Sequence, residues 1–335
     1  MHQTPRRKFL IASGALLAAQ LAHAQRAQKT YRVAAILTTS PVAEMAGPDP
    51  AHPMIRGFVH ELRALGYVEG DNLTLERRSA LGKPERYPGI VAELVGLKTD
   101  VIVTAGGAGL LSRAKKVWGT VPIVMFGSSN PVPLGMAKSL GRPGGNLTGL
   151  LAVTGPENEA KRLQLLKEAI PTLSRVAYLS TKAIWKAPFT KAVREAADPL
   201  GIELLHAEHK PDDLEATFAA IERMHPDALF VSIGTESTGQ RRQILEFAKK
   251  ARLPGSYPFD VFVALGGLMS YSVSLADLGR RAAHYVDKIL KGAYPGDLPI
   301  ERPTKFDFVV NLRTAKELGL TIPQSVLLRA DRVID

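Results

Sequence analysis

Hydrophobic residues recur along this chain with two spacings, one typical of buried strands and the other of amphipathic helices. Short apolar runs, such as residues 31–37 and 101–104, are separated by longer segments with helical spacing, such as 52–65 and 84–97. The same pattern predicts further strands at residues 73–77, 123–126, 176–179, 203–205, 228–231, 255–257 and 306–310, and further helices at 107–117, 157–169, 189–200, 214–224, 241–250, 275–290 and 314–318. Strands that alternate with helices of about 10 to 15 residues indicate βαβ units and a parallel sheet. We therefore predict an α/β fold.

The order of elements restarts after about residue 155, and the two halves share local sequence. Arg-Val-Ala opens the first strand of each half, at residues 32–34 and 175–177. Lys83 and Lys210 each precede a proline that starts a helix, and each stands 17 residues before an aspartate that leads into an apolar strand. Short sequence segments that match at the same spacing indicate a duplication, so we expect two similar lobes, each a doubly wound parallel sheet.

The last part of the chain returns to both lobes. A long helix at residues 275–290 is followed by a segment rich in proline and glycine at 292–303, which suits a crossing between lobes. We expect residues 25–150 with about 272–300 to form the first lobe, and residues 151–271 with about 301–335 to form the second. Several crossings make a hinge, and closure around a ligand is a known use of that geometry.

Residues 1–24 have the pattern of an export signal. Arg6-Arg7-Lys8 is followed by an apolar run at 9–21 and by Ala22-His23-Ala24, an A-x-A cleavage site, so the mature chain is expected to begin at Gln25. The apolar run is shorter than the roughly 20 residues that span a bilayer. The paired arginines fit the twin-arginine route, and the Sec route remains equally open. Both routes predict a periplasmic protein.

Composition narrows the function further. The chain has no cysteine, which excludes disulfides, thiolate chemistry, cysteine-bound metal and a lipid anchor on an N-terminal cysteine. The formal charge of +11 comes from lysines and arginines that are scattered along the sequence, which indicates a generally basic surface and no nucleic-acid partner. No apolar run after the signal is long enough for a transmembrane helix.

The carboxyl ends of the predicted strands are the expected ligand site, because ligands of open parallel sheets bind there. Those ends are rich in serine, threonine and glycine, whose hydroxyls and backbone N–H groups can hold a carboxylate or a phosphate. The same residue types also cap helices, which is the alternative role. In the first lobe the candidates are Thr38, Thr39, Ser40, Thr104, Ala105, Gly106, Gly127, Ser128, Ser129 and Asn130, and in the second lobe they are Ser180, Thr181, Lys182, Gly234 and Thr235.

Two aromatic and two acidic residues near these ends are further candidates. Trp185 and Tyr257 can stack on an apolar or ring-bearing ligand, or can belong to the core. Glu236 and Asp260 are the carboxylates placed to pair with a ligand ammonium, or they face solvent.

Signals of catalysis are weak. The sequence has no phosphate-binding P-loop, no nucleophile elbow and no H-E-x-x-H motif, and residues 105–109 do not match the dinucleotide fingerprint. Ser112 and Lys115 match S-x-x-K without the partner motifs, and His206 and His209 lack a carboxylate pattern that would complete a metal site. We therefore expect no catalytic residue, no metal and no cofactor.

Five segments carry a resemblance to a known family. They are residues 61–70, 142–149, 266–271, 298–306 and the ending at 319–331, which contains Gly-Leu-Thr-Ile-Pro and Leu-Arg-Ala-Asp. In these segments the chain resembles the periplasmic solute-binding proteins of ABC transporters, the group with tryptophan- and tyrosine-type amino-acid binders. The resemblance covers nearly all of the mature chain. It implies the type I periplasmic binding protein fold, with two lobes closing on a small solute that passes to an inner-membrane permease.

The resemblance also bears on the site. It implies that Ser270 and Tyr271 lie at the crossing between lobes and face the cleft. Many relatives have an aspartate where this chain has Asn130, and Trp-Asn-Pro where it has Ser180-Thr181-Lys182. Loss of a carboxylate and gain of a lysine make the cleft less favourable to a cationic group. They favour an acid, or an aromatic acid that lacks an amine.

The expected function is therefore capture of a small carboxylate-bearing solute, an amino acid or an aromatic or aliphatic acid, by a monomeric protein that performs no chemistry. A sensor that presents its ligand to a receptor kinase would have the same fold. An exported enzyme would need a convergent nucleophile–base pair, which the sequence does not show. A transcription regulator of similar fold would need an N-terminal helix-turn-helix where the export signal stands.

Overall fold

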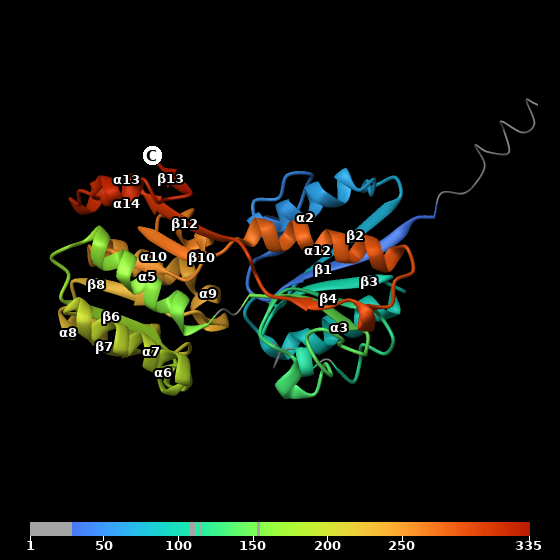
Figure 1. The fold of residues 1–335 in the computed structure, drawn as a ribbon, viewed down its shortest axis with the longest axis horizontal. Coiled ribbons are helices and arrows are strands. Elements are labelled where there is room, and N and C mark those ends of the chain that lie inside the picture. Colours follow the sequence, from blue (N-terminus) through green and yellow to red (C-terminus); the bar gives the residue numbers. More distant parts are fainter. Residues whose placement is uncertain (1–28, 108–110, 114, 153–154) are drawn as a thin grey trace, which may run out of the picture.

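The computed structural model describes residues 29–107, 111–113, 115–152 and 155–335. The predicted export signal at 1–24 lies outside these ranges, and the helix predicted at 107–117 lies partly outside them. Within the described ranges the chain forms two α/β lobes, each built around its own sheet (Figure 1). No helix in this part of the chain has the length and apolar character needed to cross a membrane.

The sheet of the first lobe has six parallel strands in the order β11-β5-β4-β3-β1-β2. The strands are β1 (Tyr31–Leu37), β2 (Leu73–Ser79), β3 (Val101–Gly106), β4 (Ile123–Ser128), β5 (Leu147–Leu151) and β11 (Ile300–Glu301). Alternate residues of β1 enter different cores: Val33 packs with α2 (Pro53–Ala64) and α12 (Leu275–Leu290), and Ile36 packs with α3 (Tyr87–Gly96). Burial on both faces explains why these strands read as continuous apolar runs.

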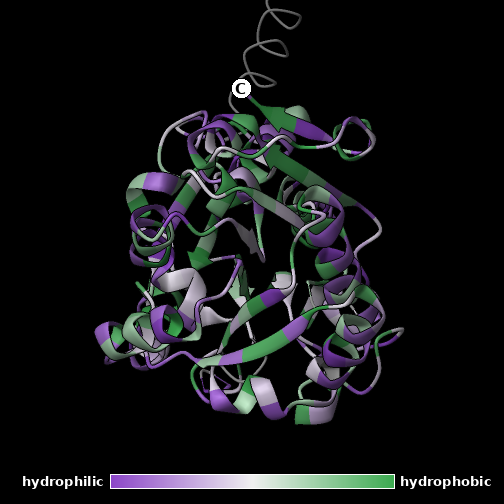
Figure 2. Cartoon of the chain, turned by 90° about the vertical axis from the view of Figure 1, so that its left-hand side faces the viewer, coloured by the Kyte–Doolittle hydropathy of each residue, from purple (hydrophilic) through white to green (hydrophobic). Residues whose placement is uncertain are grey.

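The sheet of the second lobe has seven strands in the order β13-β12-β10-β9-β8-β6-β7, and β10 and β12 are its antiparallel pair. The strands are β6 (Arg175–Ser180), β7 (Glu203–Glu208), β8 (Ala228–Val231), β9 (Gly255–Tyr257), β10 (Met269–Val273), β12 (Phe306–Asn311) and β13 (Arg332–Ile334). The helices are α5 (Pro156–Ala169), α6 (Lys182–Lys186), α7 (Pro188–Ala197), α8 (Leu214–Met224), α9 (Thr235–Gly239), α10 (Arg241–Lys250), α11 (Asp260–Val263), α13 (Leu312–Leu318) and α14 (Gln324–Leu327). Figure 2 shows hydrophobic strands in this lobe surrounded by helices of mixed hydropathy.

Equivalent aspartates hold the first strand of each lobe. The Asp100 carboxylate accepts the backbone N–H of Arg32 at 2.7 Å, and the Asp227 carboxylate accepts the backbone N–H of Arg175 at 2.8 Å. Each aspartate begins or precedes the neighbouring parallel strand, so the two contacts have the same place in the two sheets. The fold class predicted from the sequence, two similar doubly wound lobes, is confirmed.

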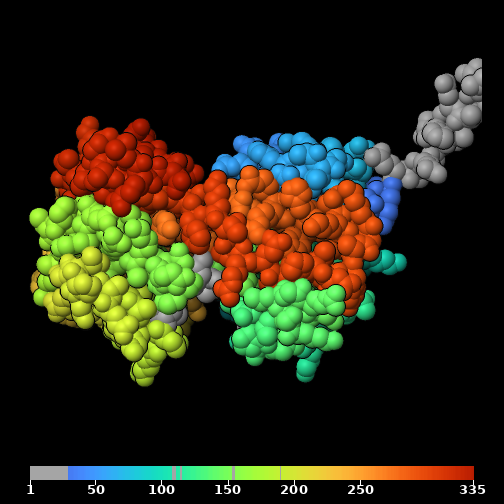
Figure 3. Space-filling view, in the orientation of Figure 1, coloured from blue at the N-terminus to red at the C-terminus, as the bar shows by residue number. Residues whose placement is uncertain are grey.

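Three segments carry the chain between the lobes: the segment from β5 to α5, the segment from β10 to α12, and the segment from β11 to β12. The second of these is very short, because Ser274 alone stands between β10 and α12. The space-filling view shows two bodies with a hollowed surface between them (Figure 3). The exact boundaries that we assign to the lobes remain a prediction.

Helices α2 and α12 approach each other backbone to backbone at two glycines. A Cβ atom added to Gly279 would lie 1.9 Å from the carbonyl oxygen of Met54, and one added to Gly57 would lie 2.4 Å from that of Ala276. Only a residue without a side chain allows such an approach. The contact therefore fixes where the first turns of both helices lie, at the edge of the lobe that faces the other lobe.

Candidate functional site

A cavity of about 240 Å³ lies between the two lobes. From the first lobe its wall takes residues at the ends of β1, β3 and β4 together with the start of α2, and from the second lobe it takes the segment from Ile233 to Thr238 and the loop around Phe259. The start of α12 completes the wall with Leu275. A larger depression of about 750 Å³ lies in the second lobe, but its walls come from that lobe alone. The interlobe cavity is therefore the candidate binding site.

The topology of the first sheet explains why three strand ends meet at this cavity. Strands β1, β3 and β4 are neighbours and run parallel, so their carboxyl ends share one edge. The register shifts near Gly106 and near Gly127, both of which have positive φ angles, 141° and 127°. Irregularities of this kind re-aim the residues that follow. Here the Ser128 hydroxyl donates a hydrogen bond to the Gly106 carbonyl and ties two strand ends together.

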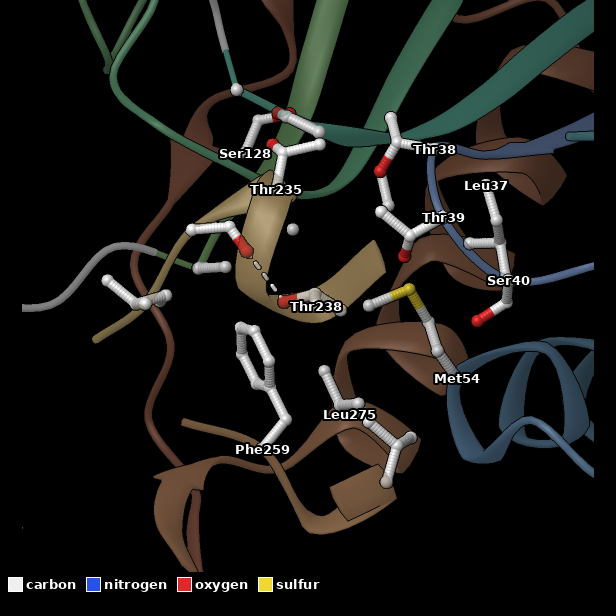
Figure 4. A pocket seen from close by; sticks show the side chains of 18 of the residues that line it. Leu37, Thr38, Thr39, Ser40, Met54, Ser128, Thr235, Thr238, Phe259 and Leu275 are labelled. Atoms are coloured by element: carbon white, nitrogen blue, oxygen red, sulfur yellow. Dashed lines mark hydrogen bonds between the residues drawn. The ribbon is translucent and has the colours of Figure 1, made fainter. Parts of the chain in front are cut away.

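Hydroxyl groups from both lobes face the cavity. Figure 4 shows Thr38 and Thr39 on one side and Thr235 on the other, with Phe259 beneath them. Thr238 donates to the carbonyl of Gly234 at 2.7 Å, which holds its side chain within the short helix α9. The hydroxyls thus form a polar part of the wall that can hydrogen-bond a solute.

The rest of the wall is mainly apolar. The side chains that supply it are Leu37, Met54, Ala105, Ala152, Ile233, Phe259, Val261 and Leu275. Among the described residues of the wall, none is an aspartate, glutamate, lysine or arginine. The arrangement suits a small solute with a hydrocarbon part and a hydrogen-bonding part.

His52 is the titratable residue in the described wall. It is buried, and its Nδ1 atom has no hydrogen-bond partner in the described chain. Burial, followed by the positive charges of Arg241 and Arg56, lowers the pKa of His52 to about 4. The imidazole is therefore neutral at pH 7, and its buried Nδ1 atom lacks a hydrogen-bond partner among the described residues.

A charged pair that joins the lobes stands directly behind one end of the cavity. Arg241 from the second lobe is 5% exposed and pairs with both carboxylate oxygens of Glu44 in the first lobe. Its guanidinium also lies 3.5 Å from the hydroxyl of Ser40, a residue of the cavity wall. The pair connects the edges of the two lobes beside the site.

Many strand-end residues predicted from the sequence lie together in this wall. They are Thr38, Thr39, Ser40, Ala105, Gly106, Gly127, Ser128, Ser129, Gly234 and Thr235. Two others from the first lobe do not line it. The Thr104 hydroxyl is hydrogen-bonded to the Tyr87 hydroxyl at 2.7 Å, and the Asn130 side chain accepts the backbone N–H of Val132 at 3.0 Å. Thr104 and Asn130 therefore stabilise the first lobe itself.

The predicted residues after β6 do not line the cavity either. Ser180 is buried, Thr181 caps α6 by accepting a backbone N–H at 3.4 Å, and Lys182 begins that helix. Trp185 stacks on His206, with ring centroids 4.5 Å apart and an angle of 3° between the planes. The aromatic face of Trp185 is thus covered within its own lobe.

The remaining predicted residues, Glu236, Tyr257, Asp260, Ser270 and Tyr271, belong to the second lobe and are absent from the wall. Tyr257 and Ser270 are buried in the core, and Tyr271 stacks on Phe306. Asp260 forms an ion pair with Arg332 at 3.0 Å, although burial outweighs that partner and raises the pKa of the Asp260 carboxyl. Glu236 is exposed on α9.

Sequence reasoning missed the residues of the wall that come from helix starts and from loops. They are His52, Met54, Ala152, Thr238, Phe259, Val261 and Leu275, and Leu37 at the end of β1 was missed as well. A signal existed for His52 and Met54, because they flank the proline that begins the first helix after β1. No local pattern marks Phe259 or Leu275, since tertiary packing alone brings them to the site. In the described chain no group of three or more histidines and carboxylates is placed to hold a metal ion.

Two parallel-sheet lobes that share a cavity at their strand ends define the class of two-lobed periplasmic binding proteins. The chain belongs to the family of ABC transporter substrate-binding proteins, whose model, "ABC transporter substrate binding protein", matches residues 42–334. The family implies a small-molecule solute and an ABC permease as partner, and its members are substrate-binding proteins rather than enzymes.

The chain is also similar to individual known proteins. A "Tyrosine-binding protein" of Clostridioides difficile is 22% identical over 287 residues, which cover 80% of this chain and 78% of the relative. A solved "conserved domain protein" of Vibrio cholerae is 26% identical with a TM-score of 0.76, over 91% of this chain and 100% of that one. A protein described as an ABC domain in complex with L-Trp, from Streptococcus pneumonia, has the same coverage and TM-score at 21% identity.

Proposed function

We propose that this protein is the periplasmic solute-binding component of an ABC uptake transporter and that it captures a small carboxylate-bearing solute, an amino acid or an aromatic or aliphatic acid. The observation that carries the proposal is the cavity of about 240 Å³ whose wall comes from both lobes. That volume lies just below the range of about 300 to 1,000 Å³ found for drug-sized ligands. It therefore suits a solute of amino-acid size.

Closure of the lobes is the proposed binding step. A solute that contacts the Thr38–Ser40 side and the Thr235 side makes its full set of contacts when both lobes are near it. Binding shifts the equilibrium toward the closed state because the solute interacts more strongly with that state than with an open one. The tyrosine-binding and tryptophan-bound relatives are consistent with a carboxylate-bearing solute that has an apolar side.

We also propose that the protein performs no chemistry and acts as a periplasmic monomer without a nucleic-acid partner. The Nδ1 atom of His52 has no hydrogen-bond partner in the described chain, whereas a general base that activates a nucleophile would be hydrogen-bonded to it. Large exposed apolar side chains, such as Leu81, Tyr294 and Leu328, lie far apart in the sequence and come from both lobes.

A thermal-shift screen tests the proposal. The protein is unfolded and refolded to remove any bound solute, and is then mixed with amino acids, aromatic and aliphatic acids, sugars and nucleosides. A solute at about 100 times its Kd adds roughly 2.7 kcal/mol and raises the melting temperature by several degrees. A saturable shift with an acid or amino acid supports the proposal. A folded protein that responds to none of these compounds, or to sugars alone, contradicts it.

A further inference from the structure

We infer that the cavity selects a monocarboxylic acid that lacks a charged amine, with the carboxylate held at the end formed by Ser40 and His52 and the hydrocarbon held against Met54, Phe259 and Leu275. The inference rests on the proposed function and deepens it by naming the substrate class. It follows from the distribution of charge and of unpartnered polar atoms around the cavity.

A ligand ammonium would find no acidic partner in the described wall. The carboxylate of Glu44, beside this end of the cavity, already accepts two hydrogen bonds of 2.9 Å from Arg241, and Arg242 lies 3.6 Å from it. Glu236 is exposed on α9 outside the wall. Placing an ammonium in a largely apolar cavity without a counter-charge costs several kcal/mol. An amino acid is therefore disfavoured relative to the same molecule without its amine.

The Ser40 and His52 end has the opposite character. The charged groups that act on the His52 ring are Arg241, from α10, and Arg56, one turn along α2, while the carboxylate of Glu44 is held by Arg241. The Arg241 guanidinium lies 3.5 Å from the Ser40 hydroxyl, and Arg241 and Arg242 together carry more charge than the one Glu44 carboxylate that they flank. The net charge beside this end is therefore positive, which favours an anion. The unpartnered Nδ1 of His52 and the Ser40 hydroxyl are polar groups that can hydrogen-bond a carboxylate there.

The other end lacks charge and offers contact area. Met54 lies in the first turn of α2, Leu275 begins α12 and Phe259 precedes α11, so three separate elements supply the apolar surface. Figure 4 shows Phe259 and Leu275 below the threonines, with Met54 beside them on the side of Ser40. A chain of carbon atoms or a ring attached to the carboxylate would be desolvated by this surface.

Matched pairs of ligands test the inference by calorimetric titration of the refolded protein. The pairs are 3-phenylpropanoate with L-phenylalanine, 4-methylpentanoate with L-leucine, and indole-3-propionate with L-tryptophan, in which the members differ by the amine. In every pair that binds, we expect the acid to bind at least tenfold more tightly than the amino acid. Equal or tighter binding of the amino acid overturns the inference and leaves the proposed function standing. If none of the three acids binds, the inference is overturned too. If no compound of the thermal-shift screen raises the melting temperature, the proposed function is overturned as well.

Variants test the position of the carboxylate. His52→Leu should weaken binding of the preferred acid at least tenfold and change binding of its uncharged primary amide less than threefold. His60→Leu, an exposed histidine on the same helix α2, is the matched control and should change neither. Equal weakening of acid and amide by His52→Leu would show that His52 only shapes the cavity, and would overturn the assignment of the carboxylate to this end. Circular dichroism and melting temperature establish that each variant is folded.

Discussion

The guanidinium of Arg241 in the second lobe is hydrogen-bonded to both carboxylate oxygens of Glu44 in the first lobe, each at 2.9 Å. Arg241 is 5% exposed and the Glu44 side chain 22%, so the pair is largely shielded from water. It stands beside the cavity and joins segments of the two lobes. The ion pair is thus a contact that exists only while the lobes are close together.

Glu44→Gln should therefore favour separation of the lobes. The substitution leaves the shielded charge of Arg241 without its partner, which costs about 2 kcal/mol or more in the closed arrangement. We expect a larger radius of gyration by small-angle X-ray scattering and a weaker affinity for the solute. Glu317→Gln, which removes an exposed pair with Lys249 inside one lobe, is the control and should change neither. An unchanged radius in Glu44→Gln would contradict a role in lobe closure.

The burial of His52 should make stability depend on pH. Its pKa is about 4 in the folded protein and about 6.5 when unfolded, so between these values the unfolded state binds a proton that the folded state does not. The contribution of His52 to the free energy of unfolding is fully present above about pH 6.5 and is lost as the pH falls toward 4. Between pH 7.5 and 4.5 it amounts to about 2.5 kcal/mol. Urea unfolding should show that His52→Gln loses less stability than the wild type over this range, by up to that amount. Parallel losses in both proteins would contradict the prediction.

Gly279→Ala should destabilise the first lobe. Its new methyl group would meet the Met54 carbonyl at 1.9 Å, and relief requires that α2 and α12 move apart. Overpacking of this kind costs about 1 to 3 kcal/mol, and displacement of Met54 should also weaken solute binding. Gly89→Ala is the matched control: Gly89 lies in α3 with no atom within 4 Å of an added Cβ, so the change should stabilise by about 0.4 to 1 kcal/mol. Equal stability of the two variants by urea unfolding would refute the close contact.

Trp185→Phe should leave the affinity for the solute within about twofold. The indole lies against His206, and the guanidinium of Arg194 lies over it at 4.8 Å, so its faces are occupied inside the second lobe. The lost stacking should appear as reduced stability of about 0.5 to 1.5 kcal/mol. Calorimetric titration measures the affinity. A tenfold loss of affinity with unchanged stability would instead place Trp185 against the solute.

The strands of both lobes were predictable where they are apolar on both faces. β1, β3 and β8 are continuous hydrophobic runs, and the structure confirms them. β5 was missed because Gly149 interrupts its pattern. A Cβ at that glycine would lie 2.2 Å from the carbonyl oxygen of Met125 on β4, so the packing of the two strands requires a glycine here. The same glycine breaks the apolar pattern by which a strand is predicted. β10 was missed because buried serines, Ser270 and Ser272, read as polar.

The site was predictable only where it follows from the sheet. The ends of β1, β3 and β4 meet because neighbouring parallel strands end on one edge, a rule that needs no knowledge of tertiary contacts. The same rule named Ser180, Thr181 and Lys182 in the second lobe, and these do not line the cavity. His52 and Leu275 come instead from helices whose positions depend on the contact between Gly279 and Met54. Packing between distant segments leaves no periodic trace in a sequence.

Only Ser274 connects β10 to the long helix α12, so a rotation at this residue changes the direction of the whole helix relative to the second lobe. With 16 residues α12 extends about 24 Å from Ser274, and Leu275 at its near end is part of the cavity wall. A rotation of 10° about that residue would displace the far end by about 4 Å, while Leu275 itself would hardly move. In the lobe closure proposed above, a small rotation at Ser274 would therefore become a larger change of spacing on the outside of the molecule. That outer spacing is what a partner in contact with both lobes would sense.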